Sequence, residues 1–264
     1  MNQYEAIFLR RSIRQYAPGA LSGAELDTVR GILAAADPLL PALPLQTHLV
    51  VEGERIQGIM SGIIGSYGKI RAPHYLVVTA APGKQSLENV GYTLEAVVLE
   101  LTAQAIATCW IGGHVKPGLL QGVVQIPEEQ EPILLISLGK AAPGVALTRA
   151  NPADAKRKPL DELILAGTPD ANWRRYLEAV RIAPSAANSQ PWRFTFDDKF
   201  VHVFQARNNI LLHKLLSTIN QVDMGIALRH LAIAAETDGG AVNFVNQPPA
   251  TVPKGMDYCM SVRR

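Results

Sequence analysis

The distribution of apolar and polar positions predicts two long helices that are buried on most sides. The first covers residues 89–107, where apolar residues recur at helical spacing and only two charges occur. The second covers residues 220–236 and is rich in alanine. Because so few charged side chains line either segment, we expect both helices to lie in the interior.

Shorter patterns place other elements around these helices. Ser22 and Glu25 form a capping box that begins a helix, which ends before Pro38. A connector that carries proline and lysine, residues 141–159, then divides the chain. The remaining patterns predict a helix over 173–180, strands over 48–51, 74–80, 133–139 and 257–262, and a hairpin over 192–205 that turns at Asp197-Asp198.

The order of elements restarts after the connector. A shift of 147 positions aligns Arg10-Arg11 with Arg157-Lys158, Ala36 with Ala183 and Pro44 with Pro191. A shift of 134 aligns Asn89-x-Gly91 with Asp223-x-Gly225 and Trp110 with Phe244. Such a repeat predicts two related half-units, residues 1–150 and 151–264, which form one unit about a pseudo-twofold axis. Chance similarity between alanine-rich helices is the alternative.

Composition limits the classes of protein. With 48% hydrophobic and 18% charged residues among 264, the chain has the composition of a soluble globular protein. Its net charge of +2 gives no electrostatic basis for binding nucleic acid or an anionic membrane. The start of the chain lacks the layout of a signal peptide, and Cys109 and Cys259 fit reduced, buried thiols. We therefore expect a cytoplasmic protein, and the scattered histidines predict no metal site.

Three common catalytic motifs are absent from the sequence. The segment from Gly62 to Lys69 has the wrong spacing for a phosphate loop, and Ile70 stands where a magnesium ligand is needed. No GxGxxG follows a predicted strand, and no GxSxG occurs. The sequence therefore gives no support to a nucleoside triphosphatase, a Rossmann dinucleotide site or an α/β-hydrolase.

A polar loop, Ala183–Trp192, lies between the second short helix and the hairpin. Its serine, asparagine and glutamine side chains stand beside a tryptophan, which suits a planar ligand with many heteroatoms, such as a flavin or nucleobase. The alternative is that these side chains only cap the end of a helix. The loop alone does not decide between the two.

Two further segments have binding chemistry. Residues 10–16 contain three arginines and a serine, and guanidinium groups bind phosphate oxygens in pairs. Residues 108–113 end in Gly112-Gly113, where a backbone N–H group can approach a ligand closely. An exposed basic turn is the alternative for the first segment, and a helix C-cap is the alternative for the second.

Together these segments resemble the nitroreductase family of FMN-dependent oxidoreductases. The resemblance rests on RRSIRQY from Arg10, TCWIGG from Thr108, VDMG from Val222 and APSAANSQPW from Ala183, with a Lys–Arg cluster after the strand that ends at Gly139. It implies an α+β, nitroreductase-like fold of two pseudo-symmetric α/β half-units with long central helices and antiparallel sheets.

The resemblance also implies roles for individual residues. Arg10, Ser12 and Arg14, with neighbouring Arg11, would bind the FMN phosphate, helped by Arg157 or Lys158. The wall against the flavin ring would be formed by Pro184, Ser185, Ala186 and Asn188. Backbone groups of Ile111, Gly112 and Gly113 would face flavin N5, and Ser66 and Lys69 would lie near N1 and O2. No side chain is assigned a catalytic acid–base role.

The activity implied is an FMN-dependent NAD(P)H oxidoreductase with ping-pong hydride transfer. NADH or NADPH would reduce the flavin, and a small electron-poor acceptor such as a nitroaromatic or a quinone would reoxidise it. Two alternatives stay open: a non-catalytic FMN-binding or redox-sensing protein, and a specialised family chemistry such as flavin cleavage or dehalogenation.

The chain departs from the family pattern in its length. Family members are usually homodimers with two flavin sites, but 264 residues are too few for two full subunits, which indicates a trimmed, fused pseudo-dimer. The second set of site positions has lost its chemistry: Ser12 and Arg14 align with Pro159 and Asp161. We therefore expect one FMN per chain, small-molecule substrates only, and a monomer, with a homodimer left open.

Overall fold

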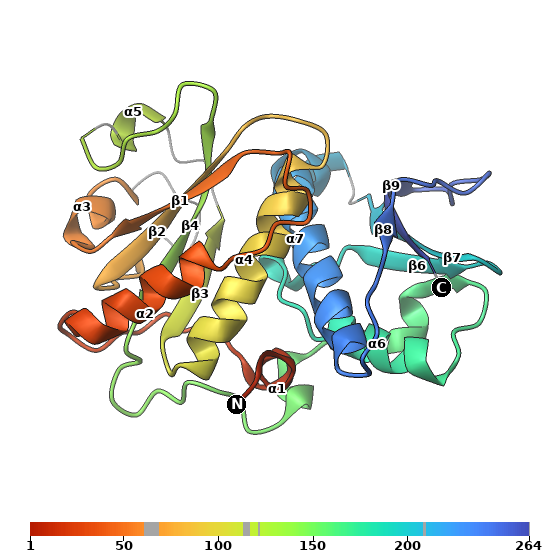
Figure 1. The fold of residues 1–264 in the computed structure, drawn as a ribbon, viewed down its shortest axis with the longest axis horizontal. Helices are drawn as coiled ribbons and strands as arrows, with labels where there is room; N and C mark the ends of the chain where they lie inside the picture. The colour runs from red at the N-terminus through yellow and green to blue at the C-terminus, as the bar shows by residue number, and fades with distance from the viewer. Residues whose placement is uncertain (61–68, 113–116, 121, 208–209, 264) are drawn as a thin grey trace. The chain divides into compact units, whose positions relative to one another are not determined.

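The computed structural model describes residues 1–60, 69–112, 117–120, 122–207 and 210–263, and for residues 210–217 it describes the backbone only. The chain divides into two units (Figure 1). Unit 1 comprises Met1–Ser86 and Ala96–Asn151, and unit 2 comprises Leu87–Glu95 and Pro152–Arg264. The later boundary follows Asn151, next to the predicted division at 150, and the first half of the long helix α4 (Ser86–Ala103) belongs to unit 2.

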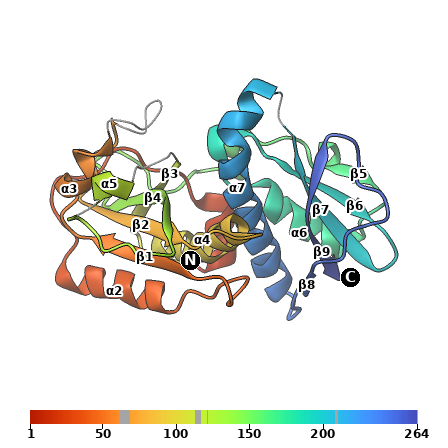
Figure 2. The same ribbon diagram turned by 90° about the horizontal axis from the view of Figure 1, so that it is seen from above.

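Unit 1 is built on an antiparallel sheet of four strands in the order β1-β2-β4-β3. The strands are β1 (Leu45–Val50), β2 (His74–Ala80), β3 (Ala107–Gly112) and β4 (Glu131–Gly139). Helix α2 runs alongside this sheet (Figure 2). Besides the second half of α4, the described helices of the unit are α1 (Gln3–Leu9), α2 (Gly23–Ala34), α3 (Glu54–Gln57) and α5 (Pro117–Leu120).

One core cluster of unit 1 lies against one face of its sheet. Alternate residues of a strand share a face, so Tyr75 and Val77 of β2 point to the same side, as do Cys109 and Ile111 of β3. All four are buried in one cluster, together with Met60 and other apolar residues. The predicted capping box of α2 is confirmed: Ser22 Oγ accepts a hydrogen bond from Glu25 N (3.3 Å), and Ser22 N donates to Glu25 Oε2 (2.9 Å).

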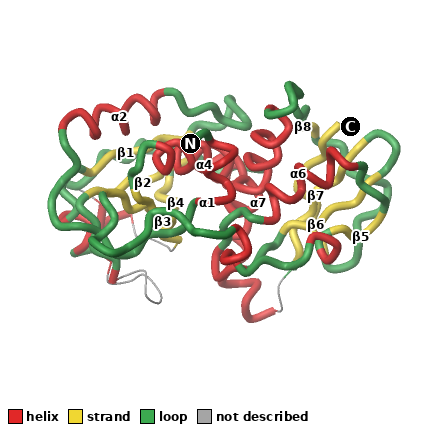
Figure 3. Tube along the Cα trace, turned by 90° about the horizontal axis from the view of Figure 1, so that it is seen from below, coloured by secondary structure: helices red, strands yellow, loops and turns green. Residues whose placement is uncertain are grey.

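Unit 2 contains a five-stranded sheet in the order β5-β6-β7-β9-β8, in which only the β5–β6 pair is parallel. Figure 3 shows the strands of each unit gathered in a sheet, apart from the helices. The strands are β5 (Ile164–Ala166), β6 (Trp192–Phe196), β7 (Phe200–Ala206), β8 (Phe244–Val245) and β9 (Met256–Arg263). The helices are α6 (Ala171–Arg181) and α7 (Ile210–Glu236), with the 3₁₀ turns η3 (Pro152–Ala155), η4 (Leu160–Glu162) and η5 (Ala186–Asn188).

The predicted hairpin of unit 2 is confirmed as β6 and β7. Asp197 fixes its turn because Oδ1 accepts hydrogen bonds from Lys199 N (2.8 Å) and Phe200 N (2.7 Å). A short acidic side chain that binds backbone N–H groups two and three residues ahead is a common way to reverse a chain. The other predicted strands and helices also occur. Strand β2 has the predicted bounds, and the ends of β1, β4, β9 and α6 differ from the predicted ones by at most three residues, whereas α7 begins at Ile210, ten residues before the predicted start.

Two predictions about the first long helix were wrong in detail. Helix α4 ends at Ala103 rather than 107, because Ala105 has a left-handed backbone (φ 58°) and Ile106 N turns back to Leu101 O (2.8 Å). The chain then continues directly into β3, a strand that the sequence patterns did not predict. Strand β3 is stabilised by pairing with β4, in which Cys109 lies opposite Ser137. That partner is distant in the sequence, so local patterns did not reveal it.

Helix α7 packs closely against the first half of α4, and both segments belong to unit 2. A Cβ atom on Gly91 would overlap Val222 O, and one on Gly225 would overlap Glu88 O. The two contacts are related by the predicted shift of 134 positions, which takes 88 to 222 and 91 to 225. Such a reciprocal contact is what a pseudo-twofold axis produces. The helix crossing thus joins positions that the shift of 134 makes equivalent.

Among the described helices, none combines the length and the apolar character that crossing a membrane requires. Both cysteines are buried thiols that form no disulfide, as expected from the sequence.

Candidate functional site

The arginine-rich segment of unit 1 lies beside strand β3 in an extended conformation. Ile13 N donates to Thr108 O (2.9 Å), and Arg10 pairs with Thr148 as an isolated antiparallel bridge. Further along, Ala17 N donates to Lys140 O (2.9 Å). Backbone hydrogen bonds on both sides therefore fix this segment, so the backbone positions from which its side chains extend are well defined.

Polar groups of this segment meet at the thiol of Cys109. Burial raises the pKa of Cys109, while the positive charges of Arg14 and Arg10 and a hydrogen bond with Ser12 partly offset that rise. Arg10 is buried, at 4% exposure, whereas Arg11 and Arg14 are exposed. Arg10, Ser12 and Arg14 thus all act on the thiol of Cys109, and their role at a phosphate stays a prediction. Two guanidinium groups and a hydroxyl form a donor set that suits a phosphate group.

The sequence reasoning did not name Arg149 as a member of this basic region. Its backbone N donates to Leu9 O (2.8 Å), and it follows Thr148, the bridge partner of Arg10. A fourth arginine therefore lies on the strand-like segment that pairs with residues 9 and 10. The signal was weak, because Arg149 stands in a proline-bearing connector with no motif around it.

The predicted residues near the flavin ring in unit 1 have varied surroundings. Ile111 is fully buried in the core, so only its backbone is available to a ligand. Gly112 is partly exposed and lies opposite Leu134 in the sheet. Lys69 is exposed. Ser66 and Gly113 lie outside the described residues.

The polar loop of unit 2 has an unusual backbone. Ala187, Asn188 and Gln190 all have left-handed conformations, with φ of 51°, 56° and 49°. For residues other than glycine this conformation costs roughly 1–2 kcal/mol each, so surrounding contacts must maintain it. Clusters of such residues are found at binding and catalytic sites more than elsewhere.

Side-chain hydrogen bonds hold the loop in this conformation. Gln190 N donates to Ser185 Oγ (2.9 Å), and Lys158 N donates to Gln190 Oε1 (2.7 Å). Asn188 Nδ2 donates to Lys156 O (3.0 Å), while Asn188 Oδ1 accepts a hydrogen bond from Arg157. The structure therefore brings the predicted residues Arg157, Lys158, Ser185 and Asn188 together.

Arg157 acts as a brace for the loop. Besides Asn188, its guanidinium donates to Ala155 O (2.9 Å) and Ile182 O (3.3 Å). The structure thus places Arg157 among the predicted ring-wall residues, and its predicted role at the phosphate stays a prediction. Burial and the charge of Arg193 lower the pKa of neighbouring Lys158.

Two buried side chains of α7 contact the loop from below, and sequence reasoning assigned neither to the site. Asp223 Oδ2 accepts a hydrogen bond from Ala186 N (3.0 Å), and Asn220 Oδ1 accepts one from Ser189 Oγ (3.2 Å). The signal that could have found them is their spacing. Two polar residues three positions apart lie on one face of an otherwise apolar helix.

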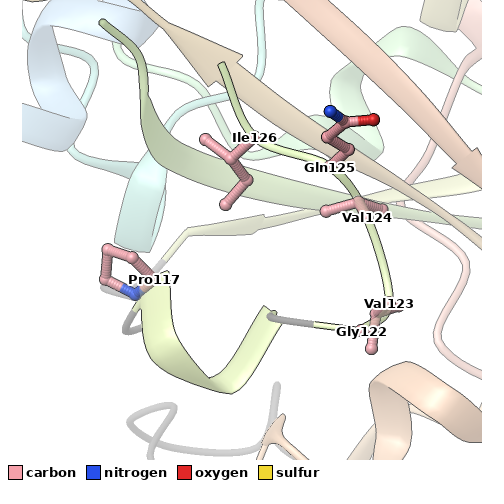
Figure 4. Close-up of a pocket in the computed structure, with 6 residues that line it drawn as sticks. All are labelled: Pro117, Gly122, Val123, Val124, Gln125 and Ile126. Atoms are coloured by element: carbon pink, nitrogen blue, oxygen red, sulfur yellow. The ribbon is translucent and has the colours of Figure 1, made fainter. Parts of the chain in front are cut away.

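Two surface pockets occur elsewhere in the units. The first, of about 570 Å³, is lined by α5 and the segment after it, as Figure 4 shows for Pro117, Gly122 and Ile126. The second, of about 210 Å³, is lined by α6 and the segment after α7, including Trp173 and Tyr176. None of the predicted site residues that the structure describes lines either pocket. The described residues also contain no cluster of potential metal ligands.

Comparison with known proteins decides the family. Residues 2–235 match the sequence profile of a family described as "Putative TM nitroreductase". The chain belongs to this nitroreductase family. The match covers both units, and it includes the arginine-rich segment, the polar loop and both long helices. The prediction of a nitroreductase-like α+β fold is therefore confirmed.

Solved structures resemble this nitroreductase-family chain at low sequence identity. A protein of Thermotoga maritima, described as a "putative nitroreductase", has 20% identity and a TM-score of 0.64, with 99% of this chain and 93% of that chain covered. A nitroreductase with bound FMN from Bacteroides fragilis has 21% identity and a TM-score of 0.47, with 57% and 95% covered. An FMN-dependent nitroreductase from Clostridium difficile has 16% identity and a TM-score of 0.48, with 58% and 96% covered. No curated protein matches the chain.

Proposed function

We propose that this chain is an FMN-dependent NAD(P)H oxidoreductase of nitroreductase type. The observation that carries the proposal is the polar loop, in which three left-handed residues are held by hydrogen bonds within a nitroreductase-family sequence. Strain of this kind is maintained where a fixed geometry serves binding. Ala187 lies five residues beyond Ile182, the C-cap of α6, so its left-handed conformation does not serve to cap that helix.

The residues present fit FMN chemically. Arg10, Arg14 and Ser12 form a donor set for a phosphate group in unit 1. In unit 2, Asn220 is fully buried, and its Nδ2 has no hydrogen-bond partner among the described residues. A buried donor without an acceptor costs about 1–3 kcal/mol, so a polar ligand or water beside the loop would stabilise it. Each set therefore has donor groups that fit part of an FMN molecule.

FMN, when bound, supplies hydride transfer between a nicotinamide and an electron-poor acceptor. The residues of the chain have supporting roles. The arginines bind the phosphate, the polar loop orients the ring, and backbone N–H groups near Gly112 stabilise negative charge on it. The substrates that we propose are NADH or NADPH as donor and a nitroaromatic or quinone as acceptor.

We propose one FMN per chain, because the repeated positions differ in chemistry. Where the first half has Ser12 and Arg14, the second half has Pro159 and Asp161. Asp161 is exposed and forms an ion pair with Arg174 (2.9 Å), and a carboxylate repels phosphate. We also propose that the active species is a monomer, which size-exclusion chromatography with light scattering would test.

The decisive experiment is anaerobic reduction of the FMN-loaded protein. After reconstitution, we expect about one FMN per chain, and bleaching of the flavin absorbance when NADH or NADPH is added. Reoxidation by a nitroaromatic or a quinone would then complete the turnover. Binding of FMN without reduction by either nicotinamide would instead identify a flavin-binding protein. A ratio near two would refute the single site.

A further inference from the structure

The polar loop of unit 2 is anchored to helix α7 at two points. Asp223 accepts a hydrogen bond from the backbone N–H of Ala186 (3.0 Å), and Asn220 accepts one from the hydroxyl of Ser189 (3.2 Å). Residues three positions apart share one face of a helix, so both anchors rise from the same surface of α7. Asp223 is 3% exposed and Asn220 is fully buried. The two contacts bracket the left-handed residues 187 and 188.

Two charged groups, Arg157 and Glu95, act on Asp223. Arg157 lies on the loop side, and Glu95 lies on α4, where its Oε1 hydrogen-bonds to His230 Nε2 of α7 (3.0 Å). Burial raises the pKa of Asp223 to about 8; the Ala186 hydrogen bond and the charge of Arg157 oppose this rise, and Glu95 adds to it. Both protonation states of Asp223 are therefore populated within the range of pH in which an enzyme can be assayed.

We propose that Asp223 is a positioning residue for the flavin. Asp223 fixes the polar loop through the Ala186 amide, and it holds the loop more tightly when its own carboxyl group has lost its proton. The proposal rests on the proposed function, since the loop is assigned to the flavin ring. Its physical basis is the strength of the hydrogen bond. An ionised carboxylate accepts from a backbone N–H more strongly than a neutral carboxylic acid does.

The size of the effect follows from this difference. Hydrogen bonds to charged groups contribute about 1 kcal/mol more than neutral ones, which corresponds to about a fivefold change in an equilibrium constant. If the fixed loop is the form that binds, the affinity for flavin rises by about fivefold between pH 6.5 and 9. Asp223→Asn keeps an acceptor for the Ala186 amide but cannot ionise, so its affinity would not show this rise.

The test is a fluorescence titration of the full-length protein with FMN and with riboflavin from pH 6.5 to 9. Riboflavin lacks the phosphate, so its binding separates a change at the loop from titration of the phosphate group. The variants are Asp223→Asn and Asp223→Ala, with Asp198→Asn as a control in the exposed turn of the hairpin. Circular dichroism confirms that each variant is folded.

We expect the wild type and Asp198→Asn to bind both flavins about fivefold more tightly at pH 9 than at pH 6.5. Asp223→Asn should show no such rise, and Asp223→Ala should bind about tenfold more weakly at pH 9. Equal pH profiles for the wild type and Asp223→Asn, with FMN bound by both, would overturn the inference alone. Absence of FMN binding by the wild type would overturn the proposed function and the inference together.

Discussion

The glycine pair at the crossing of α4 and α7 gives a quantitative test of the fold. Replacing Gly225 by alanine adds a Cβ atom that would lie closer than 3.0 Å to Glu88 O and Tyr92 N. Replacing Gly91 would place a Cβ in the same way against Val222 O. The atoms that collide are backbone atoms of packed helices, so they cannot yield as a flexible side chain would. The helices must move apart.

Two opposing terms decide the change in the free energy of unfolding. Alanine is favoured over glycine inside a helix by about 1 kcal/mol. Adding atoms to a packed interface destabilises a protein by about 1–3 kcal/mol and sometimes more. A collision with backbone atoms should cost an amount at or above the upper end of this range. Separating the helices would also weaken the cation–π contact of Arg229 with Tyr92, whose centroid is 4.0 Å from the guanidinium carbon. We expect each variant to lose about 2 kcal/mol or more.

A matched control isolates the steric term. Gly31 of α2 is also helical, but a Cβ there would meet nothing within 4 Å. Gly31→Ala should therefore stabilise the protein by about 0.5–1 kcal/mol. Urea unfolding followed by circular dichroism measures all the variants under one set of conditions.

The reciprocal contact makes a second, stricter prediction. Under a pseudo-twofold axis, Gly91→Ala and Gly225→Ala should cost similar amounts. Once one substitution has separated the helices, the other meets less resistance, so the double variant should lose clearly less than the two single losses together. A Gly225→Ala protein as stable as the wild type would refute the close crossing. Full additivity would show that the two contacts are independent.

Three other predictions concern ligand binding and pH. Arg10→Ala and Arg14→Ala should each weaken FMN binding at least tenfold, because a charge-assisted hydrogen bond contributes about 1.5–3 kcal/mol. Equilibrium titration measures the affinity, with Arg30→Ala on α2 as the control. Unchanged affinity would place the phosphate elsewhere. FMN at about 100 times its Kd should stabilise the folded protein by about 2.7 kcal/mol, seen as a rise in Tm of several degrees, and no rise would argue against binding. Asp223→Asn should change how stability depends on pH. Because the pKa of Asp223 is raised from 3.8 to about 8, the native state keeps a proton that the unfolded chain releases, and the wild type loses stability as pH rises. Between pH 5 and 8 the free energy of unfolding of the wild type should fall by about 3–4 kcal/mol relative to that of Asp223→Asn. Urea unfolding measures both proteins, and parallel pH profiles would contradict the burial of this carboxyl group.

The sequence predicted elements well where local chemistry determines them. The capping box of α2 and the hairpin turn at Asp197 depend on side chains within three residues of the groups that they bind. Strand β3 was missed because its stability comes from β4, more than twenty residues away. The start of α7 was also missed, since residues 210–219 are largely apolar and such a run does not distinguish a helix from a strand.

The features of the candidate site can also be divided into those that local sequence predicts and those that depend on tertiary contacts. Motifs identified the residue types, and the structure brings Ser185 and Asn188 together with Arg157 and Lys158. The left-handed backbone of Ala187 could not be predicted, because alanine disfavours that conformation and only surrounding contacts impose it. The anchors on α7 were overlooked for a different reason. Asp223 was noted as part of the repeat, and its burial beneath the loop depends on tertiary packing.

The two halves of the repeat share packing contacts but differ in the side chains that could bind a ligand. This difference bears on the number of FMN sites in the chain. Gly91 and Gly225 make equivalent backbone contacts, so the scaffold needs both copies of this feature. The groups that could contact a ligand are not equivalent: Asp223 aligns with Asn89, which cannot ionise, and Arg14 aligns with Asp161. If both halves maintain the fold but only one set of side chains binds the cofactor, the packing contacts of the two halves should match while their ligand-binding groups differ. The loop above Asp223 in unit 2 and the arginines around Ser12 in unit 1 are then not copies of each other, because the chemistry of their side chains differs.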